Sequence, residues 1–244
     1  MKISTGNEDM DEWLNGGYEP DIITTIYGPA GSGKTNFCVL AAAALACKGK
    51  KVIFIDTEGG FSVERLAQIA DASVLKNILM LKATSFREQR NIFNNLLGKI
   101  NKDIGLIVVD SAVMLYRLEM SQANSFHNDE QARMINRALA KQLRILSEIA
   151  RNKNIPVIVT NQVYSPFIKK EELQGIGNLE EEKAKRVQMV GGDILKYWSK
   201  CIIELRKDGA RRKAILRKHR SLPEKEFSFS ITGKGIEKSG FRLF

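Results

Sequence analysis

The sequence predicts an α/β protein with a mostly parallel, twisted sheet, helices on both faces of that sheet, and an antiparallel extension towards the C-terminus. Short apolar runs alternate with helical segments as far as residue 160, which is the pattern of parallel strands joined by crossover helices. Beyond residue 200 the pattern changes to successive strand-like runs joined by short turns, which is typical of antiparallel pairing. No internal repeat, low-complexity stretch or linker divides the 244 residues, so we expect a single domain over residues 1–244.

The predicted elements follow from local composition and turn signals. Parallel strands rich in Ile, Val and Leu are predicted at residues 22–27, 52–55, 78–81, 106–109 and 156–160. Helices are predicted at residues 34–48, 85–100 and 129–152. The first helix is apolar nearly all round, so we expect it to be covered on both sides, and the second begins with a capping box formed by Ser85 and Glu88. Antiparallel strands are predicted at residues 201–205, 213–216 and 226–231.

The composition excludes several classes of protein. Cys38, Cys47 and Cys201 are odd in number and lack metal-ligand spacing, so we expect neither a disulfide framework nor a structural zinc site. The N-terminus lacks the apolar core of a signal peptide, and the longest apolar stretch, residues 39–47, is too short to span a bilayer. We therefore expect a cytoplasmic protein with no membrane partner.

A glycine-rich turn between the first strand and the first helix carries the strongest chemical signal. Residues 28–35, GPAGSGKT, fit the phosphate-loop (P-loop) pattern GxxxxGK[ST]. Glycines let successive backbone N–H groups converge on phosphate oxygens, and the helix that follows directs its positive end at the same anion. Lys34 is expected to reach the β- and γ-phosphates, and the Thr35 hydroxyl to ligate Mg²⁺. The expected nucleotide-binding residues are Gly28, Pro29, Ala30, Gly31, Ser32, Gly33, Lys34, Thr35 and Asn36.

Carboxylates end two other predicted strands, and these carboxylates should meet the P-loop at one edge of the sheet. Asp110 follows the apolar run 106–109, and we expect it to hold the metal through a water molecule. Asp56 and Glu58 follow the run 52–55, and either could polarise a water for attack on the γ-phosphate. Spacing does not choose between them, because alternate residues of a strand lie on the same side. Gln162 ends the last parallel strand, where an amide can report whether a γ-phosphate is bound.

Four motifs, in order, resemble the RecA/RadA recombinase superfamily and, within it, the archaeal RadB group. The resemblance covers nearly the whole chain. The motifs are Ser4-Thr5-Gly6 with Asp11, Leu14 and Gly16-Gly17; Ile55-Asp56-Thr57-Glu58-Gly59 with Glu64-Arg65-Leu66; Asp110-Ser111-Ala112 with Leu115-Tyr116-Arg117; and Thr160-Asn161-Gln162-Val163.

The resemblance implies a RecA-like P-loop ATPase core that uses ATP and Mg²⁺ in homologous recombination and DNA repair. It implies that Glu58, rather than Asp56, activates the attacking water and that Gln162 senses the γ-phosphate; with Lys34 these are the expected catalytic residues. It also implies that Arg65 stacks on the adenine and that Pro223 belongs to a cap on the adenine side.

The sequence also departs from the superfamily. The ATPase motifs begin at residue 4, so we expect neither the N-terminal helix-hairpin-helix domain of full recombinases nor the linker that joins their subunits. The segment that should hold the second DNA-binding loop, residues 163–190, carries five basic and five acidic residues, and zero net charge is a poor lining for a phosphate backbone. We expect a weak ATPase without strand exchange, a possible homo-oligomer that forms no long filament, and an accessory role beside a full-length recombinase and other recombination proteins.

The net charge of +10 is concentrated in one segment. Residues 196–220 hold ten lysines and arginines against Glu204 and Asp208, a balance that favours a polyanion such as nucleic acid. We expect contacts to the DNA backbone, without base specificity. The rival interpretation is that this basic cluster binds an acidic protein or helps to cover ATP. The candidate DNA-binding residues are Arg211, Arg212, Lys213, Arg217, Lys218 and Arg220.

Other functional classes share parts of this pattern. A RecA-fold motor or hexameric ATPase would form rings or unwind DNA. A small-molecule kinase would need an arginine-rich lid and an acceptor pocket, and the strand ends at Asp110 and Gln162 argue against that class. A binding module in which ATP is purely structural stays open as well.

Overall fold

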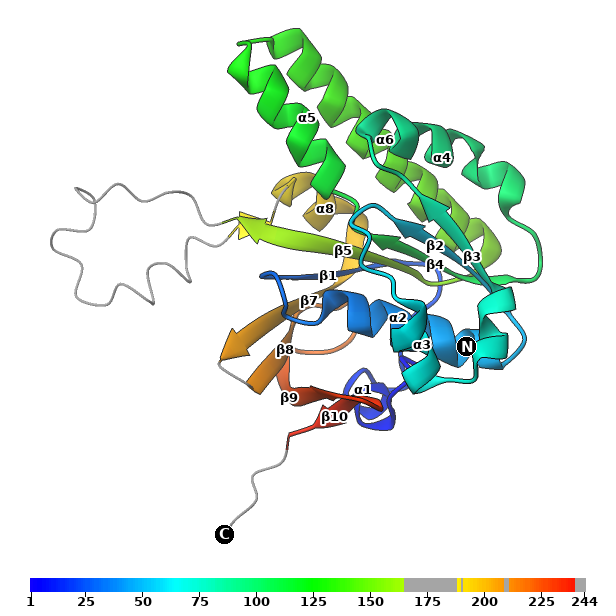
Figure 1. Ribbon diagram of the computed structural model, residues 1–244. Coiled ribbons are helices and arrows are strands. Elements are labelled where there is room, and N and C mark those ends of the chain that lie inside the picture. The colour runs from blue at the N-terminus through cyan, green and yellow to red at the C-terminus, as the bar shows by residue number, and fades with distance from the viewer. Residues whose placement is uncertain (165–187, 190, 209–210, 240–244) are drawn as a thin grey trace, which may run out of the picture.

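A computed structural model (Figure 1) describes residues 1–164, 188–189, 191–208 and 211–239. Its strands form one sheet in the order β10-β9-β8-β7-β1-β5-β4-β2-β3, with β6 paired to β5 beside this path. The strands are β1 (Ile23–Gly28), β2 (Lys51–Asp56), β3 (Ile78–Lys82), β4 (Ile104–Asp110), β5 (Val157–Tyr164), β6 (Gln188–Met189), β7 (Ser199–Asp208), β8 (Arg211–Lys218), β9 (Lys225–Thr232) and β10 (Gly235–Lys238). Pairing is parallel from β3 through β7 and antiparallel from β7 through β10, which confirms the predicted fold class.

Helices cover both faces of the sheet. They are α1 (Glu8–Trp13), α2 (Lys34–Cys47), α3 (Val63–Ile69), the 3₁₀ helix η1 (Ala72–Asn77), α4 (Phe86–Lys99), α5 (Met114–Ser125), α6 (Asp129–Lys153) and α8 (Gly192–Trp198). Figure 1 shows α2 and α3 on one face and α4, α5 and α6 on the other. Along β2, Val52 and Phe54 belong to the core under α2, whereas Ile53 and Ile55 belong to the core under α4 and α6. The period-two alternation of a strand thus builds two hydrophobic cores from one run of apolar residues.

Helix α2 is buried on every side, as its composition predicts. It contacts β1, β2, β4 and β5 on its inner side and α3, η1 and β10 on its outer side. Gly235 on β10 lies so close that a Cβ there would come 2.8 Å from Leu40 Cδ2. This burial fixes the helix whose first turn completes the P-loop.

The capping box predicted for α4 is present in a shifted form. The Ser85 hydroxyl accepts a hydrogen bond from the Glu88 backbone N–H at 3.2 Å, as predicted. The Glu88 carboxylate, however, accepts from the backbone N–H of Thr84 at 2.8 Å and from the Thr84 hydroxyl at 2.9 Å. The reciprocal bond therefore reaches one residue further back than in the standard motif.

The parallel register brings the functional strand ends to one edge of the sheet. Gly28 at the end of β1 lies beside Gln162 of β5, and Asp56 at the end of β2 lies beside Asp110 at the end of β4. Because all these strands run the same way, their carboxyl ends face the start of α2 together.

Candidate nucleotide-binding site

The P-loop between β1 and α2 has the backbone that its glycines predict. Gly31 and Gly33 have φ of 71° and 109°, a region that residues with a Cβ rarely adopt. At Gly28 the constraint is space, because a Cβ there would come 2.4 Å from the carbonyl oxygen of Leu205 on β7. The glycines therefore allow the tight turn of the loop while β7 packs closely against its start.

Lys34 is a buried cation in the loop. Its side-chain ammonium donates to the carbonyl oxygens of Gly28 and Pro29, both at 3.0 Å, and only 7% of the residue is exposed. Burial lowers the pKa of Lys34, an effect that the negative charges of Glu58 and Asp110 oppose. A dianionic phosphate group near this ammonium would stabilise its charged form.

Asp110 organises two threonine hydroxyls beside the loop. Thr35 Oγ1 donates to Asp110 Oδ2 at 2.6 Å, and the Thr160 hydroxyl donates to the other carboxylate oxygen. Asp110 is only 1% exposed; burial raises its pKa, while the bonds from Thr160 and Thr35 lower it. The carboxylate therefore fixes the orientation of the Thr35 hydroxyl, the group that is expected to reach Mg²⁺.

Asp56 and Glu58 have different surroundings. Asp56 Oδ1 accepts the backbone N–H groups of Glu58, Gly59 and Gly60 at 2.8–3.3 Å, and its Oδ2 accepts from Phe61 at 3.3 Å. Asp56 thus holds the turn after β2 with both of its oxygens. The Glu58 carboxylate instead faces the phosphate loop and accepts from Gln162 Nε2 at 2.8 Å.

One open pocket of about 490 Å³ lies at the carboxyl edge of the sheet, beside these side chains. Its lining combines the P-loop with Glu58 and Gln162, and adds Arg212 and Ile231 from the C-terminal strands. Of the residues predicted to meet here, four line this pocket: Lys34, Thr35, Glu58 and Gln162. Asp110 does not line it but accepts a hydrogen bond from Thr35.

The residues fit a nucleoside triphosphate with Mg²⁺. The Ser32 hydroxyl is buried and has no hydrogen-bond partner among the described residues, although it lies in the loop where phosphate oxygens are expected. A Cβ at Gly60 would come 3.2 Å from Thr35 Oγ1, so the absence of a side chain keeps the expected metal position accessible.

Arg65 lies beside this pocket but is fixed by in-plane hydrogen bonds. Its guanidinium donates to Asn36 Oδ1 and to the carbonyl oxygens of Thr232 and Gly235 at 2.8–3.2 Å. These bonds tie α3 to the turn between β9 and β10. They fix the orientation of the guanidinium group. Stacking of Arg65 on the adenine stays a prediction.

Pro223 does not line this pocket of its own chain, and its place in a cap on the adenine side stays a prediction. β8 begins beside the end of β7, where Arg211 pairs with Asp208, and runs back until Lys218 pairs with Ile202. The turn that follows contacts residues that precede β1, since Arg220 bonds to Glu19 and Asp21. Pro223 therefore lies at the amino edge of the sheet, whereas the P-loop lies at the carboxyl edge.

The antiparallel course of β8 also divides the basic cluster that the sequence predicts as one surface. Arg211, Arg212 and Lys213 lie at the phosphate end of β8, and Arg212 Nη2 approaches the carbonyl oxygen of Gly31 at 3.5 Å. Arg217 and Arg220 lie towards the other end, so residues that are neighbours in sequence face opposite edges.

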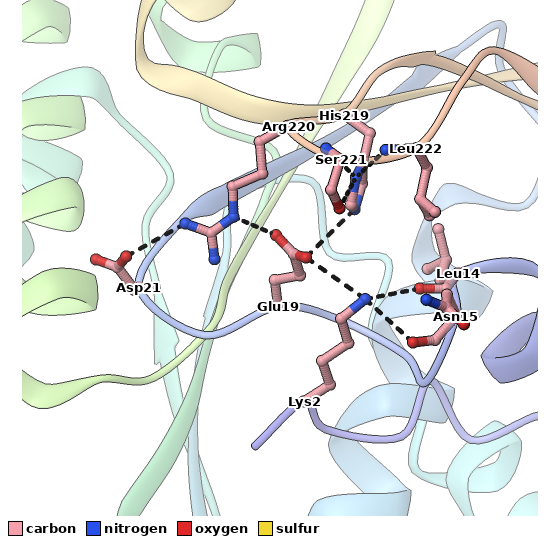
Figure 2. A network of polar contacts seen from close by, with 9 residues as sticks. All are labelled: Lys2, Leu14, Asn15, Glu19, Asp21, His219, Arg220, Ser221 and Leu222. Carbon is pink, nitrogen blue, oxygen red and sulfur yellow. Dashed lines mark hydrogen bonds and ion pairs between the residues drawn. The ribbon is translucent and has the colours of Figure 1, made fainter.

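Towards the amino edge Arg217 and Arg220 are paired with carboxylates, whereas Lys218 donates to the carbonyl oxygen of Lys196 at 2.8 Å. Arg217 bonds to Glu204 at 2.6 Å and also to Glu224. The Glu19 carboxylate lies 2.5 Å from Arg220 and 3.4 Å from Lys2, and Figure 2 shows both cations facing it. These ion pairs neutralise much of the charge on which the DNA prediction depends. The predicted second DNA-binding loop lies almost entirely outside the described residues.

Sequence reasoning missed two residues of the site. Thr160 ends the apolar run of β5 and holds Asp110, a role that its position in the TNQV motif could have indicated. Ile231 reaches the pocket from β9, and no local signal marks it, because the pairing of β9 with β8 brings it there.

Together, a parallel α/β sheet, a glycine-rich loop at its carboxyl edge and a carboxylate–threonine pair behind that loop form the arrangement expected of P-loop nucleotide-binding proteins. The comparisons with known proteins make the assignment specific. The Rad51 family model matches residues 1–239, and the chain belongs to the Rad51 family.

The similar proteins described here are all named RadB. The DNA repair and recombination protein RadB of Methanobrevibacter smithii is 39% identical over 96% of this chain and 95% of the relative. The RadB of Methanocaldococcus jannaschii is 40% identical over 93% and 98%. The crystal structure of a RadB recombinase has a TM-score of 0.73 at 32% identity and covers 98% of this chain and 100% of that one. The resemblance predicted from the four motifs is confirmed, and the chain is a recombinase-family protein of DNA repair and recombination. Among its described residues no helix is both long and apolar enough to cross a membrane.

Proposed function

We propose that this protein binds ATP with Mg²⁺, hydrolyses it slowly, binds the DNA backbone and assists a full-length recombinase without exchanging strands itself. One observation carries the nucleotide part of the proposal: five polar side chains from four separate segments converge beside one phosphate loop. They are Lys34, Thr35, Glu58, Asp110 and Gln162.

Each of these side chains has a role that its contacts support. Lys34 and the P-loop N–H groups would hold the phosphates, and Thr35, oriented by Asp110, would ligate Mg²⁺. The bound metal would neutralise charge on the phosphate oxygens. Glu58 would take a proton from the attacking water, and Gln162, which donates to Glu58 at 2.8 Å, would couple that carboxylate to the end of β5.

Slow turnover follows from the exposure of this pocket. Glu58 is an exposed residue, and water around a carboxylate screens it and weakens it as an organised base. A second protein chain over the pocket would exclude that water. We therefore expect the isolated chain to bind ATP better than it hydrolyses it.

The test of the nucleotide site compares two substitutions. Glu58→Gln should lower ATP hydrolysis by about 10²-fold or more while ATP binding stays near wild type, because the amide keeps the contact with Gln162 but is not a base. Lys34→Ala should abolish tight binding. Titration with a fluorescent ATP analogue and a phosphate-release assay measure the two effects. Equal hydrolysis by the wild type and Glu58→Gln would remove the proposed role of Glu58.

We assign the DNA contacts to the phosphate end of the β7–β8 hairpin. Lys207 and Arg211 are exposed there, and they pair with Arg212 and Asp208 in the ladder. Cations at this end would hold a DNA backbone next to the nucleotide. Arg217 and Arg220 are less suited, because carboxylates already neutralise them.

A further inference from the structure

A groove lies between α4 and the α5–α6 helix pair, the helices that Figure 1 shows together on the face of the sheet away from α2. It encloses about 400 Å³ and shares no lining residue with the nucleotide pocket. Its floor is apolar, and the exposed Met134 stands at its edge. The floor residues are Phe86, Phe93, Ile135 and Ile145.

The rim of the groove is positively charged. Four charged residues line it, and three of them are the cations Arg90, Arg137 and Lys141, against the single carboxylate of Glu119. All three cations are exposed. Within the described part of the chain no salt bridge joins them to a carboxylate, and Lys141 bonds only to Asn94 Oδ1, at 3.2 Å. A cationic rim around an apolar floor complements a ligand that is acidic and carries an apolar side chain.

A buried amide at the groove lacks a partner. Gln89 Nε2 donates to the carbonyl oxygen of Ala112 at 3.0 Å and to Gln142 Oε1 at 2.8 Å. The Ala112 carbonyl therefore fixes the Gln89 amide, and Gln89 in turn fixes the oxygen of Gln142 towards itself. This leaves Gln142 Nε2 buried without a hydrogen-bond partner among the described residues, although Gln142 lines the groove. An unpaired buried N–H is unfavourable, so the wall of the groove holds an unused hydrogen-bond donor.

We propose that this groove docks an acidic segment of a partner protein, with an apolar side chain against the exposed Met134 at the edge of the floor and carboxylates at Arg137 and Lys141. A nucleic acid is the poorer occupant, because bases stack on exposed rings, whereas Phe86 and Phe93 are 3% and 1% exposed. The proposal goes beyond the ATPase and DNA-binding functions and depends on neither.

The probe is a fluorescein-labelled synthetic peptide of about 14 residues, made of Asp and Glu with two leucines one helical turn apart. We expect it to bind the full-length chain and to bind the double variant Arg137→Glu/Lys141→Glu at least about tenfold more weakly, by fluorescence anisotropy. Arg144→Glu, which reverses one charge where the double variant reverses two, is the control, since Arg144 lies on α6 outside the groove and is 59% exposed. It should leave the affinity unchanged. ATP binding by all three proteins should be the same, which separates this test from that of the nucleotide site.

Several results would overturn the proposal. One is equal peptide affinity for the double variant and the Arg144→Glu control. Another is equal binding of a peptide whose leucines are replaced by serine, because charge alone would then account for the contact. A third is a single-stranded oligonucleotide that competes with the peptide and loses affinity in the same double variant, which would make the groove a nucleic-acid surface.

Discussion

Asp110 is the residue on which the proposed metal chemistry of this site would depend most directly. Its two carboxylate oxygens each accept a hydroxyl, from Thr35 and from Thr160. With both hydroxyl protons directed at Asp110, the Thr35 lone pairs are free for a cation. Asp110 thus orients Thr35 as a metal ligand without having to contact the metal itself.

We predict that Asp110→Asn separates ATP binding from its dependence on Mg²⁺. An amide has one acceptor oxygen, so its NH₂ group would face one of the two hydroxyls, and a Thr35 oxygen that accepts this donor is a poorer metal ligand. ATP affinity in Mg²⁺ should fall by about tenfold or more, while affinity in EDTA changes little. Titrations with and without the metal measure this difference. An equal loss in both conditions would show that Asp110 supports the loop and not the metal.

The Glu19–Arg220 pair carries a prediction about stability and pH. Burial alone would raise the pKa of Glu19, but the hydrogen bond from Arg220 and the charges of His219, Arg220 and Lys2 lower it below its ordinary range. A carboxylate with a lowered pKa stabilises the fold above its unfolded pKa, about 4.3, and this contribution is lost as pH falls through the folded pKa. Arg220→Ala should therefore lower the free energy of unfolding by about 1–3 kcal/mol at pH 7, and by less near pH 3.

Urea unfolding at both pH values checks this prediction. Arg144→Ala is the control, because Arg144 and Glu148 form an exposed i,i+4 pair that should contribute little at either pH. A loss that is the same at both pH values would mean that Arg220 stabilises the fold by packing and not by its charge.

The β7–β8 hairpin is the element whose two ends differ most in their chemistry. Its phosphate end carries exposed Lys207 and Arg211, and its opposite end joins Arg217 to Glu204 and Glu224. Lys196 and Lys200 lie near that opposite end, on α8 and at the start of β7. The two ends of the hairpin, the second together with α8, therefore offer two pairs of cations that can be removed separately.

We predict that Lys207→Ala/Arg211→Ala reduces the salt dependence of DNA binding and that Lys196→Ala/Lys200→Ala does not. Each lost phosphate contact lowers the slope of log K against log salt by about 0.7–0.9, so the first variant should lose about 1.5. Both variants remove the same charge, which makes them matched. Equal slopes for the two would place the DNA elsewhere or leave only the non-specific effect of net charge.

Among the secondary-structure elements, the sequence predicts the strands of the parallel sheet well and several other elements poorly. The strand at residues 156–160 extends as β5 to Tyr164 because Val163 pairs with Met189, a partner far away in the sequence. Helix α5 is not predicted, since it is polar over much of its length; it is held by packing on α6, with Tyr116 bonded to Asn136 at 2.8 Å. Local patterns miss elements whose stability comes from tertiary contacts.

The candidate site is predicted better than the charged surface, for a physical reason. Parallel strands bring their carboxyl ends to one edge whatever the connections between them, so Lys34, Glu58 and Asp110 meet as expected. A hairpin strand does the opposite, because it runs from one edge of the sheet to the other. Residues at its two ends are close in sequence but lie at opposite edges. The segment 211–220 therefore looks like one basic cluster in the sequence and becomes two in the fold.

At the scale of the whole molecule, the sheet separates three surfaces. The nucleotide pocket and the phosphate end of β8 share the carboxyl edge, where Arg212 lines the pocket. The ion-paired turn after β8 occupies the amino edge, and the groove along α4 and α6 lies on one face. With the ligands that we propose, this arrangement would let nucleotide and DNA influence each other while a protein partner docks elsewhere.

The shared edge makes coupling between ATP and DNA the final prediction. If nucleotide fixes Arg212 and the hairpin in the arrangement that DNA prefers, ATP–Mg²⁺ should raise DNA affinity by about tenfold, within the usual range of such coupling. Thermodynamic linkage then requires DNA to raise ATP affinity by the same factor. Lys34→Ala should bind DNA with the affinity of the nucleotide-free wild type and should not respond to ATP. Anisotropy titrations of DNA with and without ATP–Mg²⁺, and of labelled ATP with and without DNA, measure both sides of the cycle. Unequal factors would point to a change in oligomeric state during one titration, and a factor of one in both directions would mean that the two ligands occupy the edge independently.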